Sequence, residues 1–361
     1  MAALVMVGLL SRYVMGRVLV GVALVSLLLV GVYSLIELIR EARALGEGYG
    51  AVQMLWYLAQ TTPRRLYDIF PFAALIGTLL GLGGLAAGNE LVAMRAAGFD
   101  RRQLVIRVLA AVMLCLVVLV LLSELAIPGL EASARADREQ ARTSQVYRGG
   151  HGDLWLRDGE QVVRVGYSAW LADDRIEFGE LLIYTLDAAM RPRDIITAER
   201  ASHEQGHWHL QQASRRSLET GEGLARIENL SLASDLNPGL FAATVSRPRL
   251  LPMSDLVRMR AFLERNGLDA ERYIQAFWDR LFFPINVLAM VLIGLPFVFR
   301  DQRSGGRGLN LFAGVALGLA YFVLTRLVQG VTMIVPAPIW LASLLPALLI
   351  VLLAGLLLRR L

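Results

Sequence analysis

Long uninterrupted apolar segments dominate the hydrophobic pattern of the chain. A helix rises about 1.5 Å per residue, so roughly 20 apolar residues cross a hydrocarbon core of about 30 Å. The uncharged segments are Val18–Ile36, Ile69–Asn89, Val108–Ser123 with its apolar extension to Pro128, Leu281–Phe299, Gly308–Thr325 and the part of Leu327–Leu358 that follows Pro336 and Pro338. The pattern predicts six membrane-spanning helices, because buried helices of a soluble protein do not account for so many such segments.

A region of different character, residues 129–270, separates the third and fourth segments. It is charged and helical up to about Gln145, where it continues the third helix, and then changes to short segments typical of strands. The expected strands are Leu154–Arg157, Gln161–Val165, Leu181–Thr185, Asp194–Ala198, His207–Gln211 and Ala225–Leu230, with a hairpin turn at Asp158-Gly159. Many short strands at this spacing suggest a sandwich or jelly roll.

A helix is expected near Asp255–Arg265, capped by Ser254 and ended by Asn266-Gly267, and Asp269 starts the helix that runs into the fourth span. The expected fold is therefore a membrane α-helical protein with six transmembrane helices, arranged 3+3 around an inserted β-jelly-roll domain. The first three helices occupy residues 1–128, the β-jelly-roll-like domain with its flanking helices 129–270, and the last three helices 271–361.

The distribution of arginine predicts the orientation of the helices. Short cytoplasmic loops of membrane proteins are enriched in Lys and Arg. Segments on the side of the N-terminus hold eleven arginines against three acidic residues, whereas the segment between the first two spans is balanced. Both termini are therefore expected in the cytoplasm, and the β domain on the opposite side of the membrane.

All 36 basic residues are arginine, which limits the possible chemistry. Without lysine there is no Walker A motif, so any ATP that drives the protein would be hydrolysed by another subunit. H-E-x-x-H and G-x-S-x-G motifs are absent as well. His207 and His209 share one face of a strand, but no third metal ligand is apparent nearby. We expect no catalytic residue, metal or cofactor, and a role in transport or as a scaffold.

Charged residues stand at the outer ends of the predicted spans. Glu37 and Arg40 share a face of the first helix, Arg64 precedes the second span, and Arg135 and Arg138 lie beyond the third. Arginine binds phosphate through two parallel hydrogen bonds, so these side chains could hold a phosphorylated amphiphile. They could also be boundary anchors paired with nearby carboxylates. The residues alone leave both interpretations open.

The loop between the second and third spans, about residues 89–98, is predicted to form a short helix. Asn89 suits the N-cap, Glu90 complements the positive end of the helix dipole, and Gly98 suits the C-terminal stop. The permease of an ATP-driven transporter presents such a helix to its ATPase. A surface turn without special function fits the same residues.

Several collinear segments resemble the LptF/LptG permease family of lipopolysaccharide exporters. They are Phe70–Gly83, Asn89–Gly98, the hairpin Gly152–Gly159, Arg272-Tyr273, Phe277-Trp278 and Phe283-Pro284, and they keep the 3 + β domain + 3 order over nearly the whole chain. The Leu154–Gly159 hairpin and the end of the first helix, Leu35–Arg40, are more similar to the LptG branch of the family than to the LptF branch.

The resemblance implies a permease subunit of an ABC-type exporter in a Gram-negative inner membrane, with a periplasmic β domain. Its implied partners are an LptF-like paralogue in a heterodimer, an LptB-like ATPase dimer, an LptC-like single-span protein and, indirectly, LptA. The substrate would be lipopolysaccharide, and no nucleic acid is expected. Residue by residue, the resemblance places Glu37, Arg40, Arg64, Arg135 and Arg138 at the lipopolysaccharide, and Glu90, Leu91, Met94 and Arg95 at the ATPase.

Two positions depart from the family pattern. Ser34 and Glu41 stand where family members can carry lysine, and Arg43, Arg65 or Arg326 could compensate. Three alternatives also remain at this stage: the LptF paralogue or another lipid permease, a non-transporting membrane scaffold, and an intramembrane enzyme, which the missing motifs disfavour.

Overall fold

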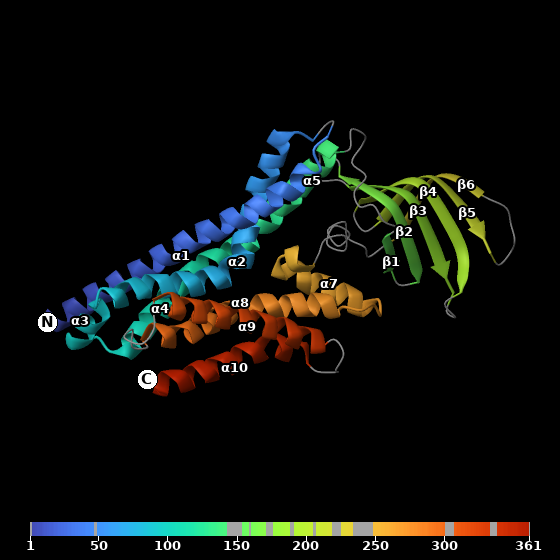
Figure 1. Ribbon diagram of the computed structural model, residues 1–361. Coiled ribbons are helices and arrows are strands. Elements are labelled where there is room, and N and C mark those ends of the chain that lie inside the picture. The colour runs from blue at the N-terminus through green and yellow to red at the C-terminus, as the bar shows by residue number, and fades with distance from the viewer. Residues whose placement is uncertain are drawn as a thin grey trace. The chain divides into compact units, whose positions relative to one another are not determined.

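The computed structural model describes residues 2–46, 49–142, 154–158, 160–170, 176–187, 191–204, 207–218, 225–233, 248–299, 307–332 and 338–360. The chain divides into two compact units. The first comprises Met1–Leu45, Met54–Ala132 and Gln275–Leu361, and the second comprises Gly46–Gln53 and Ser133–Ile274. Most helices belong to the first unit and the β-sheet to the second (Figure 1).

Six helices of the described chain are long and apolar enough to cross a membrane, which confirms the predicted number of spans. They are α1 (Ala2–Ala42), α2 (Ala51–Ala87), α4 (Arg101–Leu125), α8 (Glu271–Phe299), α9 (Arg307–Thr332) and α10 (Ile339–Arg360). As predicted, the sixth span begins only after the two prolines, at Ile339, while Leu327 belongs to α9. The chain is therefore a multi-pass membrane protein.

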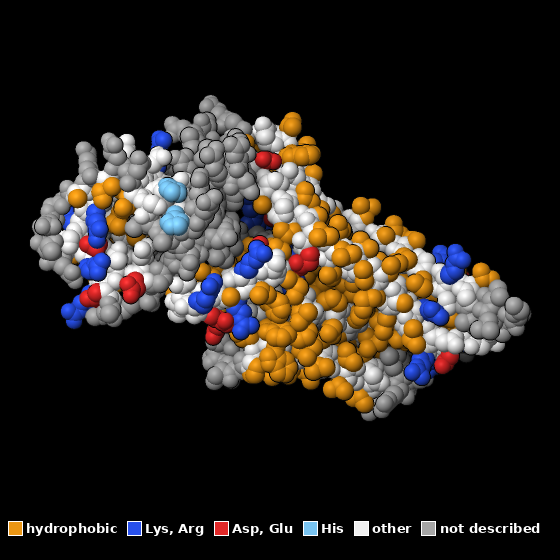
Figure 2. Space-filling view, turned by 180° about the vertical axis from the view of Figure 1, so that it is seen from behind, with side chains coloured by type: hydrophobic (Ala, Val, Ile, Leu, Met, Phe, Trp, Pro, Cys, Tyr) orange, Lys and Arg blue, Asp and Glu red, His pale blue; other side chains and the backbone are white. Residues whose placement is uncertain are grey.

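Apolar side chains cover the outer surface of these helices. Figure 2 shows hydrophobic side chains gathered over the middle of the helical unit, with charged side chains toward its ends. Leu27 and Leu28 on α1 and Leu352 on α10 are each more than 60% exposed. In water such a surface would be unfavourable, but hydrocarbon chains of lipids can cover it.

The first two helices are much longer than their apolar segments. At about 1.5 Å per residue, the 41 residues of α1 and the 37 residues of α2 extend about 60 Å and 55 Å, roughly twice the hydrocarbon thickness. Each helix therefore carries charged residues beyond its apolar segment, including Glu37 on α1 and Arg64 on α2.

Glycines bring α1 and α2 into backbone contact. A Cβ built on Gly77 of α2 would lie 2.4 Å from the Cα of Val22 on α1, and one on Gly81 would lie 2.6 Å from the carbonyl oxygen of Arg17. Real side chains do not fit at such distances, so only glycine permits this crossing. Small residues at membrane helix interfaces allow close packing, which contributes van der Waals attraction.

Leucine side chains on another face of α2 pack against glycines of α8 and α9. A Cβ on Gly294 of α8 or on Gly318 of α9 would come within 2.5 Å of a methyl group of Leu75. One methyl group of Leu79 lies against Gly314 in the same way, at 2.4 Å from the position of a Cβ. These contacts place α2 at the centre of the apolar core, where Leu75 is 1% exposed.

The sequence analysis expected the third span to continue outward as one helix, but the structure shows a break. α4 ends at Leu125, Ala126 caps it, and α5 (Ile127–Arg142) follows. Pro128 explains the break, because it has no N–H to offer the carbonyl one turn earlier, at Glu124, and its ring crowds that turn. The outward extension is confirmed to Arg142, and the predicted end near Gln145 lies outside the described residues.

The second unit holds an antiparallel sheet of six described strands. They are β1 (Leu154–Asp158), β2 (Gln161–Trp170), β3 (Ile176–Leu186), β4 (Pro192–Glu204), β5 (His207–Ser217) and β6 (Ala225–Ala233). All six predicted strands are confirmed, and each is longer than predicted. In the described sheet each strand pairs with its sequence neighbours, in the order β1-β2-β3-β4-β5-β6. An inserted antiparallel β domain is thus confirmed, and its described strands form one meandering sheet rather than the two layers of a sandwich.

Two local predictions in this unit require correction. Asp158 is the last residue of β1 and pairs with Gln161, so it belongs to the strand pair and not to the turn, while Gly159 lies outside the described residues. Helix α7 (Met253–Arg265) begins earlier than predicted, with Pro252 in the cap position and no side-chain cap from Ser254. Its predicted end is confirmed by Gly267, whose φ is +66°.

An ion pair between neighbouring strands stabilises the sheet. Arg215 of β5 donates to Asp194 of β4 at 2.8 Å, and Arg193 does so at 3.3 Å. The hydrogen bond from Arg215, with that from Arg193, holds the pKa of Asp194 below its ordinary value despite burial of the carboxylate. The pair therefore stabilises the folded sheet at neutral pH, and the contribution is lost as the pH falls below about 4 through the lowered pKa.

Replacing Gly77 with valine should separate α1 from α2, because the new Cβ would overlap the backbone of Val22. We expect a loss of about 1–3 kcal/mol, measured as a lower thermal unfolding temperature of the detergent-purified protein. Gly83→Val is the matched control, since a Cβ on Gly83 of the same helix meets nothing within 4 Å. Equal unfolding temperatures for the two variants would contradict the described crossing.

Candidate functional site

The six spanning helices have two chemically different ends. The insert end is defined by the end of α4, at Leu125, and the matching end of α8, between which the β-sheet segment is inserted. The α3 end carries both chain termini and the short helix α3 (Glu90–Ala96) (Figure 1). The charged residues singled out in the sequence fall at one end or the other.

Glu37 and Arg40 form an ion pair on α1 at the insert end. Arg40 Nη1 lies 3.5 Å from Glu37 Oε2, which confirms that the two side chains share a helix face. The Arg40 side chain is 69% exposed, so this contact is weak and most of the guanidinium remains accessible to a ligand.

Arg64 on α2 forms a bidentate ion pair with the carboxylate of Asp68. Its Nη2 lies 3.1 Å from Asp68 Oδ1 and its Nε 3.2 Å from Oδ2, and it stacks over the ring of Tyr67. The Arg64 side chain is only 12% exposed, against 47% for Asp68. A phosphate would therefore reach Arg64 by replacing Asp68, since the two anions offer the same bidentate geometry.

Arg65 has a structural role that the sequence did not reveal. Pro63 has no N–H for the carbonyl of Ala59, one turn earlier in α2. The neighbouring carbonyl, of Leu58, accepts side-chain hydrogen bonds from Thr62 at 2.8 Å and Arg65 at 3.1 Å. Arg65 also donates to Thr61 at 2.6 Å. It is 5% exposed, so it supports the bent helix and does not present a charge that could compensate for Ser34.

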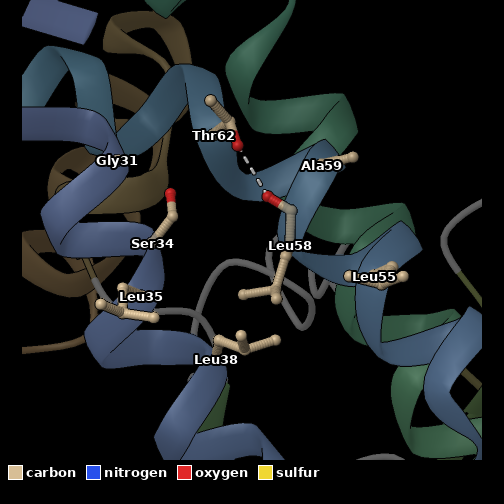
Figure 3. A pocket seen from close by; sticks show the side chains of 8 residues that line it. All are labelled: Gly31, Ser34, Leu35, Leu38, Leu55, Leu58, Ala59 and Thr62. Carbon is tan, nitrogen blue, oxygen red and sulfur yellow. Dashed lines mark hydrogen bonds between the residues drawn. The ribbon is translucent and has the colours of Figure 1, made fainter. Parts of the chain in front are cut away.

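A pocket of about 350 Å³ lies between α1 and α2 at this end (Figure 3). Apolar side chains form most of its wall. The lining residues are Gly31, Ser34, Leu35 and Leu38 of α1 and Leu55, Leu58, Ala59 and Thr62 of α2. Ser34 joins the pocket to the buried arginine, because its hydroxyl accepts a hydrogen bond from Arg65 at 3.3 Å. The pocket therefore offers an apolar space close to the charged end of both helices.

The structure adds an ion pair that the sequence analysis missed. Arg280 of α8 lies 2.7 Å from Glu124 of α4 and donates to the carbonyl of Ser123 at 2.7 Å. The Arg280 side chain is 8% exposed and that of Glu124 26%. Both residues border apolar segments of the sequence, and a charge at such a position is a signal for an interhelical partner.

A second missed set of polar contacts joins the last three helices. Asp279 of α8 accepts hydrogen bonds from Gln329 of α9 at 2.9 Å and from Ser343 of α10 at 2.6 Å. Deeper in the span, Asn286 of α8 accepts from the hydroxyl of Tyr321 on α9. These contacts place α8, α9 and α10 in one hydrogen-bonded group, which is how polar side chains at membrane depth are satisfied.

The remaining predicted lipid contacts belong to the second unit. Arg135 and Arg138 lie three residues apart on α5, within Ser133–Ile274, and both engage in interactions there. The structure brings Glu37 and Arg40 together on α1 in the first unit. Arg135 and Arg138 belong to the second unit. Arg326, another of the three possible compensating residues, stacks over the ring of Phe322 at 5.1 Å on α9.

At the opposite end, α3 has the predicted position and a well-defined stop. Gly98 has a φ of +88°, its N–H donates to the Arg95 carbonyl, and the next N–H, of Phe99, donates to Met94. This is the Schellman arrangement that satisfies the last carbonyls of a helix. Asn89 is the N-cap residue, but it has a left-handed backbone and makes no side-chain cap, which corrects that part of the prediction.

The face of α3 differs from the predicted one. Met94 is 6% exposed and belongs to the apolar core, and Leu91 packs against the same core. Val92, Ala93 and Arg95 are exposed. Met94 and Leu91 therefore anchor α3 to the spanning helices, and the surface open to another protein is formed by Val92, Ala93 and Arg95.

Glu90, at the start of α3, contacts α1. Its Oε2 accepts a hydrogen bond from the hydroxyl of Tyr13 at 2.8 Å. Arg17, one turn further along α1, donates to that hydroxyl through Nη2 at 2.8 Å and Nε at 3.2 Å. The short helix is thus tied to α1 by a polar chain as well as by its apolar side.

The described residues include no group of three His, Cys, Asp or Glu side chains placed to hold a metal ion. His207 and His209 are exposed on β5.

This combination defines a class of multi-pass membrane protein, with two groups of three spanning helices, an inserted β-sheet, a charged insert end and a short surface helix at the other end. The family model described as the lipopolysaccharide export system permease LptF/LptG matches residues 12–360, so the chain belongs to that family. It is accordingly a transporter permease and not an enzyme.

Two relatives are similar over nearly their whole length. The lipopolysaccharide export system permease protein LptG of Haemophilus influenzae is 29% identical over 361 residues, covering 98% of this chain and 99% of that protein. LptG of Escherichia coli K12 is 28% identical over 345 residues, covering 94% of this chain and 95% of that protein. Both are LptG proteins, which agrees with the branch favoured by the sequence.

Replacing Arg280 with methionine should destabilise the helical unit, because the Glu124 carboxylate loses its ion-pair partner in a largely buried place. Removal of one member of a buried pair costs about 3–5 kcal/mol, measured here by thermal unfolding in detergent. The double variant Arg280→Met/Glu124→Gln should recover the part of that loss that comes from the unpaired carboxylate, while the lost hydrogen bond to the Ser123 carbonyl remains. Arg40→Met, which removes an exposed pair, serves as control and should change stability little. A double variant as unstable as the single one would exclude the charge as the cause.

Proposed function

We propose that this chain is the LptG-type permease subunit of an ABC-type exporter that removes lipopolysaccharide from the inner membrane. The family match over residues 12–360 carries the proposal. The arrangement of six spans around a β-sheet supports it, because extraction of a lipid requires a membrane part, and delivery out of the membrane requires a part outside it.

In this proposal the insert end faces the periplasm and the α3 end the cytoplasm. Clustering of arginine near the α3 end supports the orientation. An LptF-like paralogue completes the transporter as a heterodimer, and an LptB-like ATPase dimer hydrolyses the ATP. An LptC-like single-span protein and, beyond it, LptA receive the lipid from the β domain.

The arginines of the insert end bind phosphate groups of the lipid. Arg40 is accessible and weakly paired, and Arg64 already grips a carboxylate with the geometry that a phosphate would use. Arg135 and Arg138 add charge on α5, and Glu37 orients Arg40. The apolar pocket beside Ser34 provides space for part of an acyl chain near the same end.

The ATPase binds the exposed face of α3. Val92 is 62% exposed, and a small residue, Ala93, and a cation, Arg95, lie beside it. Glu90 lies at the edge of this face, where it can contact both α1 and the partner. Movement of the ATPase would then act on the spanning helices through Leu91 and Met94, which fix α3 to the core.

Reversing the charge of Glu90 should uncouple ATP hydrolysis from lipid movement without unfolding the protein. In Glu90→Lys the lysine cannot accept the hydrogen bond from Tyr13, while the apolar anchor of α3 is unchanged. The measurement is lipopolysaccharide release and phosphate production by the complex, purified from its native membrane and placed in proteoliposomes. Asp255→Lys, on α7 of the second unit, is the charge-matched control, since the Asp255 side chain is 38% exposed.

The same purification tests the wider proposal, because mass spectrometry identifies the proteins that accompany the tagged chain. Recovery of a six-span paralogue and a soluble ATPase in stoichiometric amounts supports the transporter. Recovery of the chain alone, or with periplasmic proteins but no ATPase, contradicts it. Normal export by the Glu90→Lys complex would exclude only the role of Glu90.

Removing Arg40 or Arg64 should weaken lipid binding. Loss of one charged hydrogen-bonding group costs about 1.5–3 kcal/mol, so Arg40→Ala or Arg64→Ala should lower the lipopolysaccharide retained by the purified complex roughly tenfold. Asp68→Asn should act in the opposite direction, because it removes the carboxylate that competes for Arg64. Arg258→Ala is the control, as Arg258 on α7 is 75% exposed and pairs with Asp255. Lipid retention that is equal in all four variants would refute phosphate binding here.

A further inference from the structure

A polar chain links the short helix α3 to the first spanning helix. The hydroxyl of Tyr13 donates to Glu90 Oε2 at 2.8 Å, while it accepts from Arg17 Nη2 at 2.8 Å and from Nε at 3.2 Å. A phenol hydroxyl has one proton to donate and can also accept hydrogen bonds. The Tyr13 hydroxyl does both here, since it donates to Glu90 and accepts from Arg17. The three groups form the sequence carboxylate, phenol, guanidinium, in which each hydrogen bond polarises the next.

Arg17 also fixes the ring of Tyr13. Its guanidinium carbon lies 5.1 Å from the ring centroid, within the range of a cation–π contact. Tyr13 and Arg17 are four residues apart and therefore lie on the same face of α1. The position of the phenol is thus determined by α1, whereas its hydrogen-bond acceptor belongs to α3.

The backbone of α1 is held firmly at the same level. The carbonyl oxygen of Arg17 lies against Gly81 of α2, where a Cβ would approach it to 2.6 Å. Val14 and Val18, on either side of Arg17 along α1, are fully buried. A force applied to Tyr13 therefore acts on a packed, rigid part of α1 and not on a loosely held end.

We propose that Tyr13 is a positioning residue that transmits the movement of α3 to α1, through its hydrogen bond with Glu90. The inference rests on the proposed function, because it requires that an ATPase moves α3. It adds a defined path for that movement. Glu90 carries the displacement of α3, and Tyr13 receives it on α1. Arg17 holds the Tyr13 side chain, and the Arg17 backbone packs against Gly81 of α2, so the displacement reaches the backbone of α1. The other end of the same helix carries Glu37 and Arg40.

The decisive variant is Tyr13→Phe, which removes only the hydroxyl and keeps the ring that Arg17 covers. In the complete complex in proteoliposomes, the amount of lipopolysaccharide released per ATP hydrolysed should fall roughly three- to tenfold, the effect of losing one hydrogen bond. Tyr33→Phe is the matched control, because Tyr33 lies on the same helix and is 37% exposed. It should leave the ratio unchanged.

A purely structural role for Tyr13 would lower the yield or stability of the complex and leave the ratio of lipid to ATP unchanged, which would overturn the proposal. A double-mutant cycle gives a second criterion. In a Glu90→Ala background, which removes the acceptor of the Tyr13 hydroxyl, Tyr13→Phe should have little further effect on the ratio, since the two residues act through one contact. Additive effects would overturn the proposed path.

Movement itself can be measured by spin labels, because Cys115 is the single cysteine and can be replaced by serine. Labels at Leu9→Cys on α1 and Ala96→Cys on α3, both exposed and outside the face of α3 proposed to bind the ATPase, report the distance between the helices. With Tyr13 present, this distance should stay nearly constant when ATP or ADP with vanadate is added. In Tyr13→Phe it should change by several ångströms, because α3 moves without α1. A constant distance in the Tyr13→Phe complex would contradict the proposal.

These outcomes separate the relay from the proposed function. If Glu90→Lys uncouples the complex and Tyr13→Phe does not, the ATPase acts on α3 but the path through Tyr13 is wrong. If no ATPase accompanies the chain at all, the proposed function fails first, and the relay with it.

Discussion

Polar groups at membrane depth have no water to bind, so the protein must satisfy them internally. This constraint explains where the helices are joined. In α2, beside Pro63, Arg65 and Thr62 donate to the carbonyl of Leu58. At the break between α4 and α5, Arg280 of α8 donates to the carbonyl of Ser123 and pairs with Glu124. In both places an arginine close to a proline binds a backbone carbonyl with one of its several donors.

The insert end therefore contains two kinds of arginine. Arg65 and Arg280 are buried and hold helices together, whereas Arg40 is exposed and Arg64 is paired with a solvent-accessible carboxylate. Only the second kind can exchange its partner for a lipid phosphate at small cost. An arginine that holds the backbone cannot be withdrawn without leaving a carbonyl unsatisfied. An arginine at this end is consequently a candidate for lipid contact only if its guanidinium does not already bind a backbone carbonyl of the protein.

The sequence predicted those features that repeat along the chain. Six spans, six strands and the position of α3 follow from apolar segment length, alternation and stop signals, and all agree with the structure. It did not predict contacts that depend on three-dimensional neighbours. Met94 resembled a surface residue of a short helix, yet the core of the spans buries it. Arg280 and Glu124 are 156 positions apart, and nothing local in the chain indicates that they meet. Asn89 was predicted to cap α3 with its side chain, but it has a left-handed backbone conformation and its side chain makes no capping hydrogen bond.

The first helix connects the two ends of the transporter. Near the α3 end it contacts Glu90 through Tyr13 and packs against Gly81, and further along it crosses Gly77 without an intervening side chain. Between these points there is neither proline nor a break in α1, so the helix can transmit force along its length. Its far end carries Glu37 and Arg40 and forms one wall of the apolar pocket. A small rotation of α1 would thus alter both the position of Arg40, the proposed phosphate-binding group, and the width of the space beside it. By contrast, α2 contains Pro63 and Pro71 and is bent, so it serves better as the surface against which α1 turns.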